Sequence, residues 1–205
     1  MLRLVRRILP VVGVVVAFGV SAPGALAACA NADASASSAT AVGATLCLLN
    51  EQRAAHGLTA LTESSVLDRA AEGYAQDMVD GSFFDHVSPG GGTMLQRIKA
   101  AGWAPAGAWS AGENIAWGSG SLSTPASIVD GWMHSAGHRA NILNGAYGLI
   151  GIGIAAGAPQ DGVAGDAGTY VTDFASGTSA KRAAAVKCSV RGGKKRCARA
   201  ASKKR

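Results

Sequence analysis

Three short segments of the sequence place ionisable residues beside aromatic residues and turns, and each contains one residue suited to chemistry. These residues are His86, Glu113 and His138. Two neutral imidazoles and one carboxylate on separate loops can provide three ligands to zinc or another divalent cation and leave an open position for water. In a metal-dependent hydrolase of this kind, His86 and His138 would hold the ion, and Glu113 would complete the shell or act as general base.

Two interpretations without catalysis compete with the hydrolase. The three residues can form a buried hydrogen-bonded network that holds three loops together, with Glu113 paired to an imidazolium or to Arg139. They can also line a cleft that binds a small ligand, with a divalent metal as an option. The sequence lacks the close-spaced His-Glu-x-x-His pair of zinc proteases. We therefore favour a binding or interaction module over an enzyme.

Residues near His138 have weaker claims to a role. Ser135 joins the candidate cleft, but only Glu113 could orient His138, so a Ser–His nucleophile is not favoured. We expect Gly137 to break the helix after His134, which is then a surface or capping residue.

All four tryptophans lie between residues 103 and 132. We interpret them as core residues, with an aromatic rim for sugars or lipids as the alternative.

Hydrophobic residues at helical spacing predict four helices that must position these segments. The first contains Val42, Leu46, Leu49 and Arg53, and the second is capped by Thr62 and ends at Gly81. The third begins at Thr93, turns Met94, Leu95 and Ile98 inward and stops at Gly102. The fourth begins at Thr124-Pro125 and turns Trp132 toward the core.

Strands are predicted at 149–154 and 169–174, with a third near 109–115. The first of these alternates branched residues with Gly151 and Gly153. One of its faces is expected to pack in the core, and the other to let backbone or a helix approach closely. The pattern contains no repeat and no second core, so it indicates one α/β domain in which helices flank a sheet.

The N-terminus contains the three parts of a secretory signal. Arg3, Arg6 and Arg7 precede an apolar run over 8–20, and residues 25–27 provide a small-residue cleavage site. Residues 1–27 are therefore predicted to be a signal peptide, and the protein is expected to be secreted or to remain in the cell envelope.

Four cysteines form two local pairs, and an even number in an exported protein favours disulfides. The predicted bonds are Cys29–Cys47 and Cys188–Cys197. Residues 26–29 also fit a lipoprotein box, but lipidation of Cys29 would leave Cys47 unpaired, so the disulfide is favoured. Residues 28–39 are rich in alanine and serine and are predicted to be a flexible N-terminal segment.

Charge divides sharply along the chain, which has a net charge of +6. Residues 181–205 contain eleven basic residues and no acid, whereas all thirteen acids lie between the leader and this tail. Residues 177–205 are predicted to be a disordered basic tail with a small disulfide loop. Such a tail suits an anionic wall polymer, lipid headgroups or nucleic acid. The chain is expected to be a monomer.

The runs Gly-Glu-Asn-Ile-Ala at 112–116 and Gly-His-Arg-Ala-Asn-Ile-Leu at 137–143 resemble the CAP superfamily (cysteine-rich secretory, antigen 5 and pathogenesis-related-1 proteins) in its bacterial form. The resemblance covers about residues 40–176. It implies a three-layer α-β-α sandwich, a cleft shared by His86, Glu113 and His138, and, in some members, lipid or sterol carriage. Many members carry a second glutamate three residues after the helix tryptophan, where this chain has Ser135.

Overall fold

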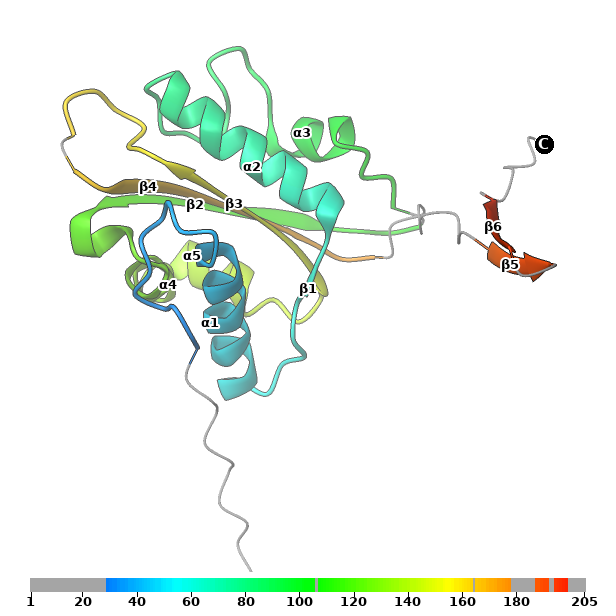
Figure 1. Ribbon diagram of the computed structural model, residues 1–205. Helices are drawn as coiled ribbons and strands as arrows, with labels where there is room; N and C mark the ends of the chain where they lie inside the picture. Colours follow the sequence, from blue (N-terminus) through cyan, green and yellow to red (C-terminus); the bar gives the residue numbers. More distant parts are fainter. Residues whose placement is uncertain (1–28, 106, 164, 178–186, 192–193, 199–205) are drawn as a thin grey trace, which may run out of the picture.

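The computed structural model describes residues 29–105, 107–163, 165–177, 187–191 and 194–198. In these residues a four-stranded sheet lies between two layers of helices (Figure 1), as predicted. The strands are β1 (Thr62–Glu63), β2 (Ala111–Ser119), β3 (Leu149–Ala156) and β4 (Ala167–Ala175), in the order β1-β3-β4-β2. Strand β1 is parallel to β3, and the other neighbours are antiparallel.

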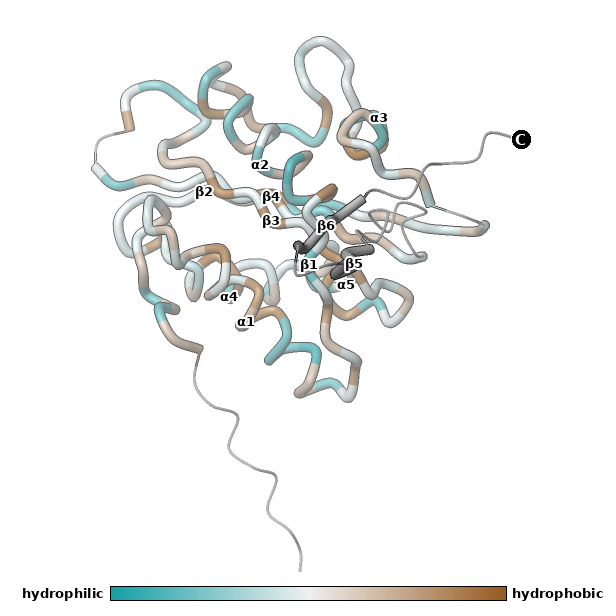
Figure 2. The backbone as a smooth tube through the Cα atoms, turned by 45° about the vertical axis from the view of Figure 1, so that its right-hand side comes forward, coloured by the Kyte–Doolittle hydropathy of each residue, from teal (hydrophilic) through white to brown (hydrophobic). Residues whose placement is uncertain are grey.

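The helices divide between the two faces of the sheet. Helices α2 (Ser65–Asp80) and α3 (Met94–Ala100) cover one face, above the sheet in Figure 1. Helices α1 (Ala41–Ala55), α4 (Pro125–His134) and α5 (Ala136–Ile142) cover the other face, and the short helix η1 (Gly120–Ser123) connects β2 to α4. Strand β4 is buried along its whole length and β3 along most of it, because both of their faces are covered; Figure 2 shows hydrophobic residues in this central part of the sheet.

Strand β3 uses its two faces as the sequence predicts. A Cβ atom at Gly151 or Gly153 would overlap the backbone of α2 at Leu67 or Ala71, so α2 packs directly on the strand. The opposite face turns Ile150 and Ile152 into the core beneath α1 and α4, and both are fully buried. The glycines therefore set the distance between α2 and the sheet.

Helix starts are predicted well where a cap acts locally. Thr93 forms a capping box with Gln96 at the start of α3, and the Thr124 side chain caps α4 ahead of Pro125. The prediction that Thr62 caps the second helix is wrong, since Thr62 pairs with β3 and Ser64 is the N-cap. The prediction that Leu95 faces inward is also wrong. Ile98 lies on the buried face of α3, whereas Leu95 lies on another face and is 42% exposed.

The N-terminal segment is attached to the domain by the predicted Cys29–Cys47 disulfide. Residues 30–39, predicted to be flexible, form turns in which Ala36 is buried. No helix in the described part of the chain is long and apolar enough to cross a membrane. The predicted signal peptide lies outside the described residues.

Part of the basic tail forms a hairpin of β5 (Lys187–Arg191) and β6 (Lys194–Ala198). Their antiparallel register places Cys188 opposite Cys197. The side chains of this hairpin lie outside the described residues, so the second disulfide stays a prediction.

Candidate functional site

Glu113 is the centre of a charged network at the edge of the sheet. Its side chain is only 3% exposed, and each of its oxygens accepts one hydrogen bond. The His86 Nδ1–H donates to Oε1 at 2.8 Å, and Arg97 Nη2 donates to Oε2 at 2.6 Å. Glu113 and His86 therefore meet as predicted, and a third residue, Arg97, holds the pair although no local sequence pattern marks it.

Helix α3 and the aromatic ring of Tyr74 position Arg97. The capping box at Thr93 fixes the start of α3, and Arg97 lies one turn later with its guanidinium 3.2 Å from the centre of the Tyr74 ring. Arg97 also donates to the carbonyls of Gly92 and His86. Of the two partners predicted for Glu113, an imidazolium or Arg139, the structure has the His86 imidazole, and Arg139 is exposed on α5 and contacts His56.

His138 lies on a separate short helix. The break between α4 and α5 occurs at Ser135, whose extended backbone (φ −102°, ψ 122°) interrupts the helix, so the prediction of a break at Gly137 is wrong. Gly137 lies in the first turn of α5. His134 is exposed at the end of α4, as expected, and contacts Asp130. His138 is half-buried and packs at a tilt against Trp132, with ring centres 6.5 Å apart.

Two asparagines join α5 to strand β2. Asn114 donates to the His138 carbonyl at 3.1 Å, and Asn141 donates to the Glu113 carbonyl at 3.1 Å and to the Asn114 side chain at 2.9 Å. The bond from Asn141 satisfies one backbone carbonyl of β2, which is an edge strand of the described sheet. They also fix His138 relative to Glu113.

The two imidazoles differ in protonation. The hydrogen bond to Glu113 is the main cause of a raised pKa at His86. Burial, and then the charge of His86, lower the pKa of His138. Near neutral pH the site therefore presents a neutral imidazole at His138, next to an imidazole that is protonated more readily.

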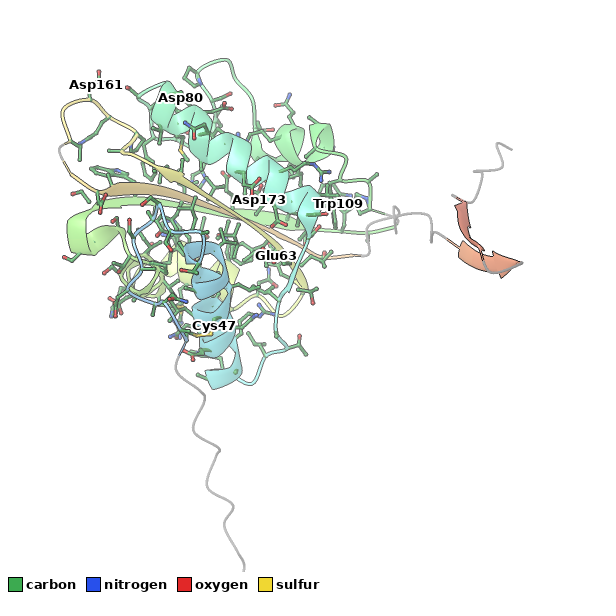
Figure 3. The ribbon with its side chains drawn as sticks, in the orientation of Figure 1. Cys47, Glu63, Asp80, Trp109, Asp161 and Asp173 are labelled. Carbon is green, nitrogen blue, oxygen red and sulfur yellow. A yellow bond between two sulfur atoms is a disulfide. The ribbon has the colours of Figure 1, made fainter. Side chains whose placement is uncertain are left out.

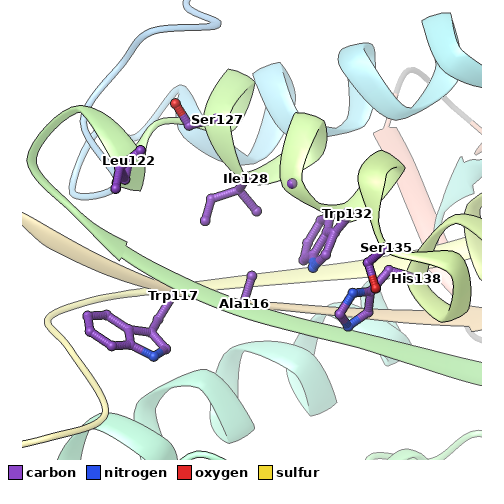
Figure 4. Close-up of a pocket in the computed structure, with 9 residues that line it drawn as sticks. Ala116, Trp117, Leu122, Ser127, Ile128, Trp132, Ser135 and His138 are labelled. Carbon is purple, nitrogen blue, oxygen red and sulfur yellow. The ribbon is translucent and has the colours of Figure 1, made fainter.

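A groove of about 350 Å³ runs from His138 along β2 and α4 to η1 (Figure 4). Its lining is mainly apolar, with Ser135 and His138 at one end and Trp117 and Leu122 at the other; the remaining lining residues are Ala116, Ser127, Ile128, Gly131 and Trp132. Within the described chain, the His138 ring nitrogens form no hydrogen bond. Trp132 donates its indole N–H to the Ile115 carbonyl and is core, whereas Trp117 is partly exposed.

Comparison with known proteins decides the family. The model of the CAP, or cysteine-rich secretory protein, family matches residues 46–173. This protein belongs to the CAP family. The uncharacterised protein YkwD of Bacillus subtilis is 41% identical over 106 residues, which are 52% of this chain and 39% of YkwD. The chain thus spans less than half the length of that relative.

Solved structures show the same CAP fold. An extracellular protein with an SCP domain from Bacillus anthracis aligns with a TM-score of 0.54 and 29% identity, over 66% of this chain and 40% of its own. An outer surface protein of Borrelia burgdorferi aligns with a TM-score of 0.52 and 20% identity, over 63% and 87% of the two chains. These neighbours are extracellular or surface proteins.

In the described residues, His86, Glu113 and His138 do not bring three ligand atoms within 4.8 Å of one another. In the described residues, the one group of three potential ligand atoms within 4.8 Å of one another is Cys29, Cys47 and Glu51, and both cysteines are in the disulfide. Each Glu113 oxygen accepts a hydrogen bond, one from His86 and one from Arg97. That position is typical of a carboxylate that orients a ligating histidine. Zinc binding by His86 and His138 stays a prediction.

Proposed function

We propose that this CAP domain is an extracytoplasmic binding module that holds an amphiphilic small molecule in the groove beside β2. The polar group of the ligand lies at His138 and Ser135, and its apolar part lies against Trp117, Ile128 and Trp132. The observation that carries the proposal is an apolar groove of about 350 Å³ that ends at an imidazole with no hydrogen bond to the described residues. Grooves of this size, with few polar groups at one end, suit small ligands.

The chemistry of the lining supports an amphiphile over a sugar. Sugars are held by many hydrogen bonds, whereas the polar lining here consists of two serines and His138. The N–H of a neutral imidazole can donate to a carboxylate oxygen, which suits a ligand with a single polar group of that kind. The extracellular and surface nature of the structural neighbours supports a location outside the cytoplasm.

Tryptophan fluorescence with lauric acid as probe tests the proposal, because Trp117 would be covered by the ligand. We expect saturable binding that weakens at least tenfold in Gly131→Leu, about 1.4 kcal/mol. A Cβ at Gly131 meets no atom within 4 Å, so the leucine fills the groove without a backbone clash. Gly43→Leu is the matched control, since Gly43 is also in a helix with open space around it.

Replacement of the polar end separates its role from that of the groove. His138→Ala should weaken lauric acid binding, but should leave binding of its methyl ester nearly unchanged. Equal binding of lauric acid to the wild type and Gly131→Leu, or no saturable signal with either probe, would overturn the proposal.

We also propose that the basic tail over 181–205 tethers the domain to anionic wall polymer. The tail contains eleven basic residues and no acidic residue, so its affinity for the polymer should fall steeply as the salt concentration rises. The test compares retention on purified cell envelope for the mature chain and for a chain ending at Gly177, across a salt series. Equal retention of the two chains at low salt would show that the tail is not the tether.

A further inference from the structure

Asp173 is the most deeply buried carboxyl group near the site. It lies on β4 and is 1% exposed. Figure 3 shows it between the sheet and α2. The antiparallel register places it opposite Glu113 on β2 and opposite Gly151 on β3. Residues directly opposite one another share a face of the sheet, so Asp173 has Glu113 on one side and a residue without a side chain on the other.

Neither Asp173 oxygen accepts a hydrogen bond from a donor in the described residues. An ionised carboxylate in that position would be desolvated and unpaired, which strongly disfavours the charged form. The donors of the neighbouring charged groups are directed elsewhere, because His86 Nδ1 and Arg97 Nη2 both donate to Glu113. Two adjacent carboxyl groups can form a hydrogen bond only when one of them carries a proton.

The geometry also decides which carboxyl carries it. Glu113 accepts from a guanidinium and an imidazole, so it is the ionised member of the pair. Asp173 has no such partner. Burial, and then the negative charge of Glu113, raise the pKa of Asp173 well above its ordinary range, against a smaller opposing effect of Arg97.

We infer that Asp173 is a neutral carboxylic acid whose O–H donates to the Glu113 carboxylate, and that the two residues share one proton inside the sheet. Asp173 is then a positioning residue. Together with Arg97 it holds the Glu113 side chain so that Oε1 receives the His86 Nδ1–H. The sheet thus stores a proton directly behind the ion network, in a position that solvent does not reach.

Infrared difference spectroscopy at pH 8 tests the protonation directly. The wild type should show the carbonyl stretch of a protonated carboxylic acid, and Asp173→Asn should lose it. Asp68→Asn is the matched control, because burial raises the pKa of Asp68 only to about 6, so that group is ionised at pH 8. A wild type without the band, or a band that survives in Asp173→Asn, would overturn the inference.

Proton NMR of the His86 Nδ1–H tests the positioning role. Asp173→Asn keeps a donor toward Glu113 and should keep this downfield resonance, whereas the similarly sized, donor-free Asp173→Leu should broaden or shift it. Circular dichroism establishes that each variant is folded. An unchanged resonance in folded Asp173→Leu would overturn the positioning role, and the infrared result on the wild type stands independently of how the variants fold.

Discussion

Replacement of Arg53 is expected to destabilise the domain more than the loss of any surface charge. Arg53 is fully buried on α1 and has no carboxylate partner among the described residues. Its guanidinium donates to the carbonyls of Thr59, Ile142, Asn144 and Tyr147 at 2.8–3.0 Å. Burial lowers the pKa of Arg53, yet an arginine remains charged in proteins.

The magnitude follows from those four bonds. Each hydrogen bond to a charged donor contributes about 1.5–3 kcal/mol, and Arg53→Met leaves four backbone carbonyls that no substitution can remove. The variant no longer buries a charged guanidinium, and this gain offsets several kcal/mol of the stability lost with the four hydrogen bonds. We expect a net loss of about 3–5 kcal/mol, which lowers Tm by roughly 6–20 °C for a domain of this size. Arg53→Lys should lose about half as much, since one ammonium cannot reach carbonyls on all sides.

Urea denaturation followed by tryptophan fluorescence measures this loss. Arg139→Met is the matched control, because Arg139 is exposed and its change should stay within about 0.5 kcal/mol. If the free energy of unfolding of Arg53→Met lies within about 1 kcal/mol of the wild-type value, water satisfies the carbonyls in the variant. That result would refute the reasoning on Arg53.

Four further predictions concern packing, titration, covalent structure and metal. Gly153→Ala should cost about 3 kcal/mol or more by urea denaturation, because its Cβ would overlap the α2 backbone, while an Ala at Gly43 should be neutral or stabilising. Burial, the main cause, raises the pKa of Asp68 to about 6. The folded state therefore binds this proton more tightly, and stability falls as pH rises from about 4 through 6. Asp68→Asn should remove that fall and stabilise the domain by about 1 kcal/mol at pH 7.5, after discounting for partial exposure; a stability curve that keeps its slope would contradict this assignment. Intact mass before and after reduction should show two disulfides and no lipid on Cys29. Calorimetry should show zinc heat that His86→Ala and His138→Ala each abolish, and zinc heat equal to the buffer blank in the wild type would end the metal hypothesis.

The sequence predicts the fold best where a residue acts on its immediate neighbours. The caps at Thr93 and Thr124 were identified because a capping side chain bonds within one turn of its own helix. The glycines of β3 were identified because their alternation is visible in the chain. The prediction that Thr62 caps a helix is wrong because its extended backbone pairs with β3. That contact is with a distant segment, and no local pattern reveals it.

The site also contains residues that the sequence reveals and residues that only the packing of distant segments reveals. His86, Glu113 and His138 stand out by residue type and by resemblance to a family. Arg97 and Asp173 do not, because their roles depend on how α3 packs and on the register of β2 against β4. A shift of that register by one residue would turn Asp173 to the opposite face of the sheet.

The strand order of the sheet has a consequence for how the protein is made. Strand β4 lies between β3 and β2, yet it is the last of the four strands in the chain. Until residues 167–175 have been synthesised, β2 lacks its partner, and β3 has only the two residue pairs that it shares with β1. The sheet therefore closes late and through contacts distant in sequence, which makes folding slow. The order of its strands therefore delays completion of the four-stranded sheet until residues 167–175 are available.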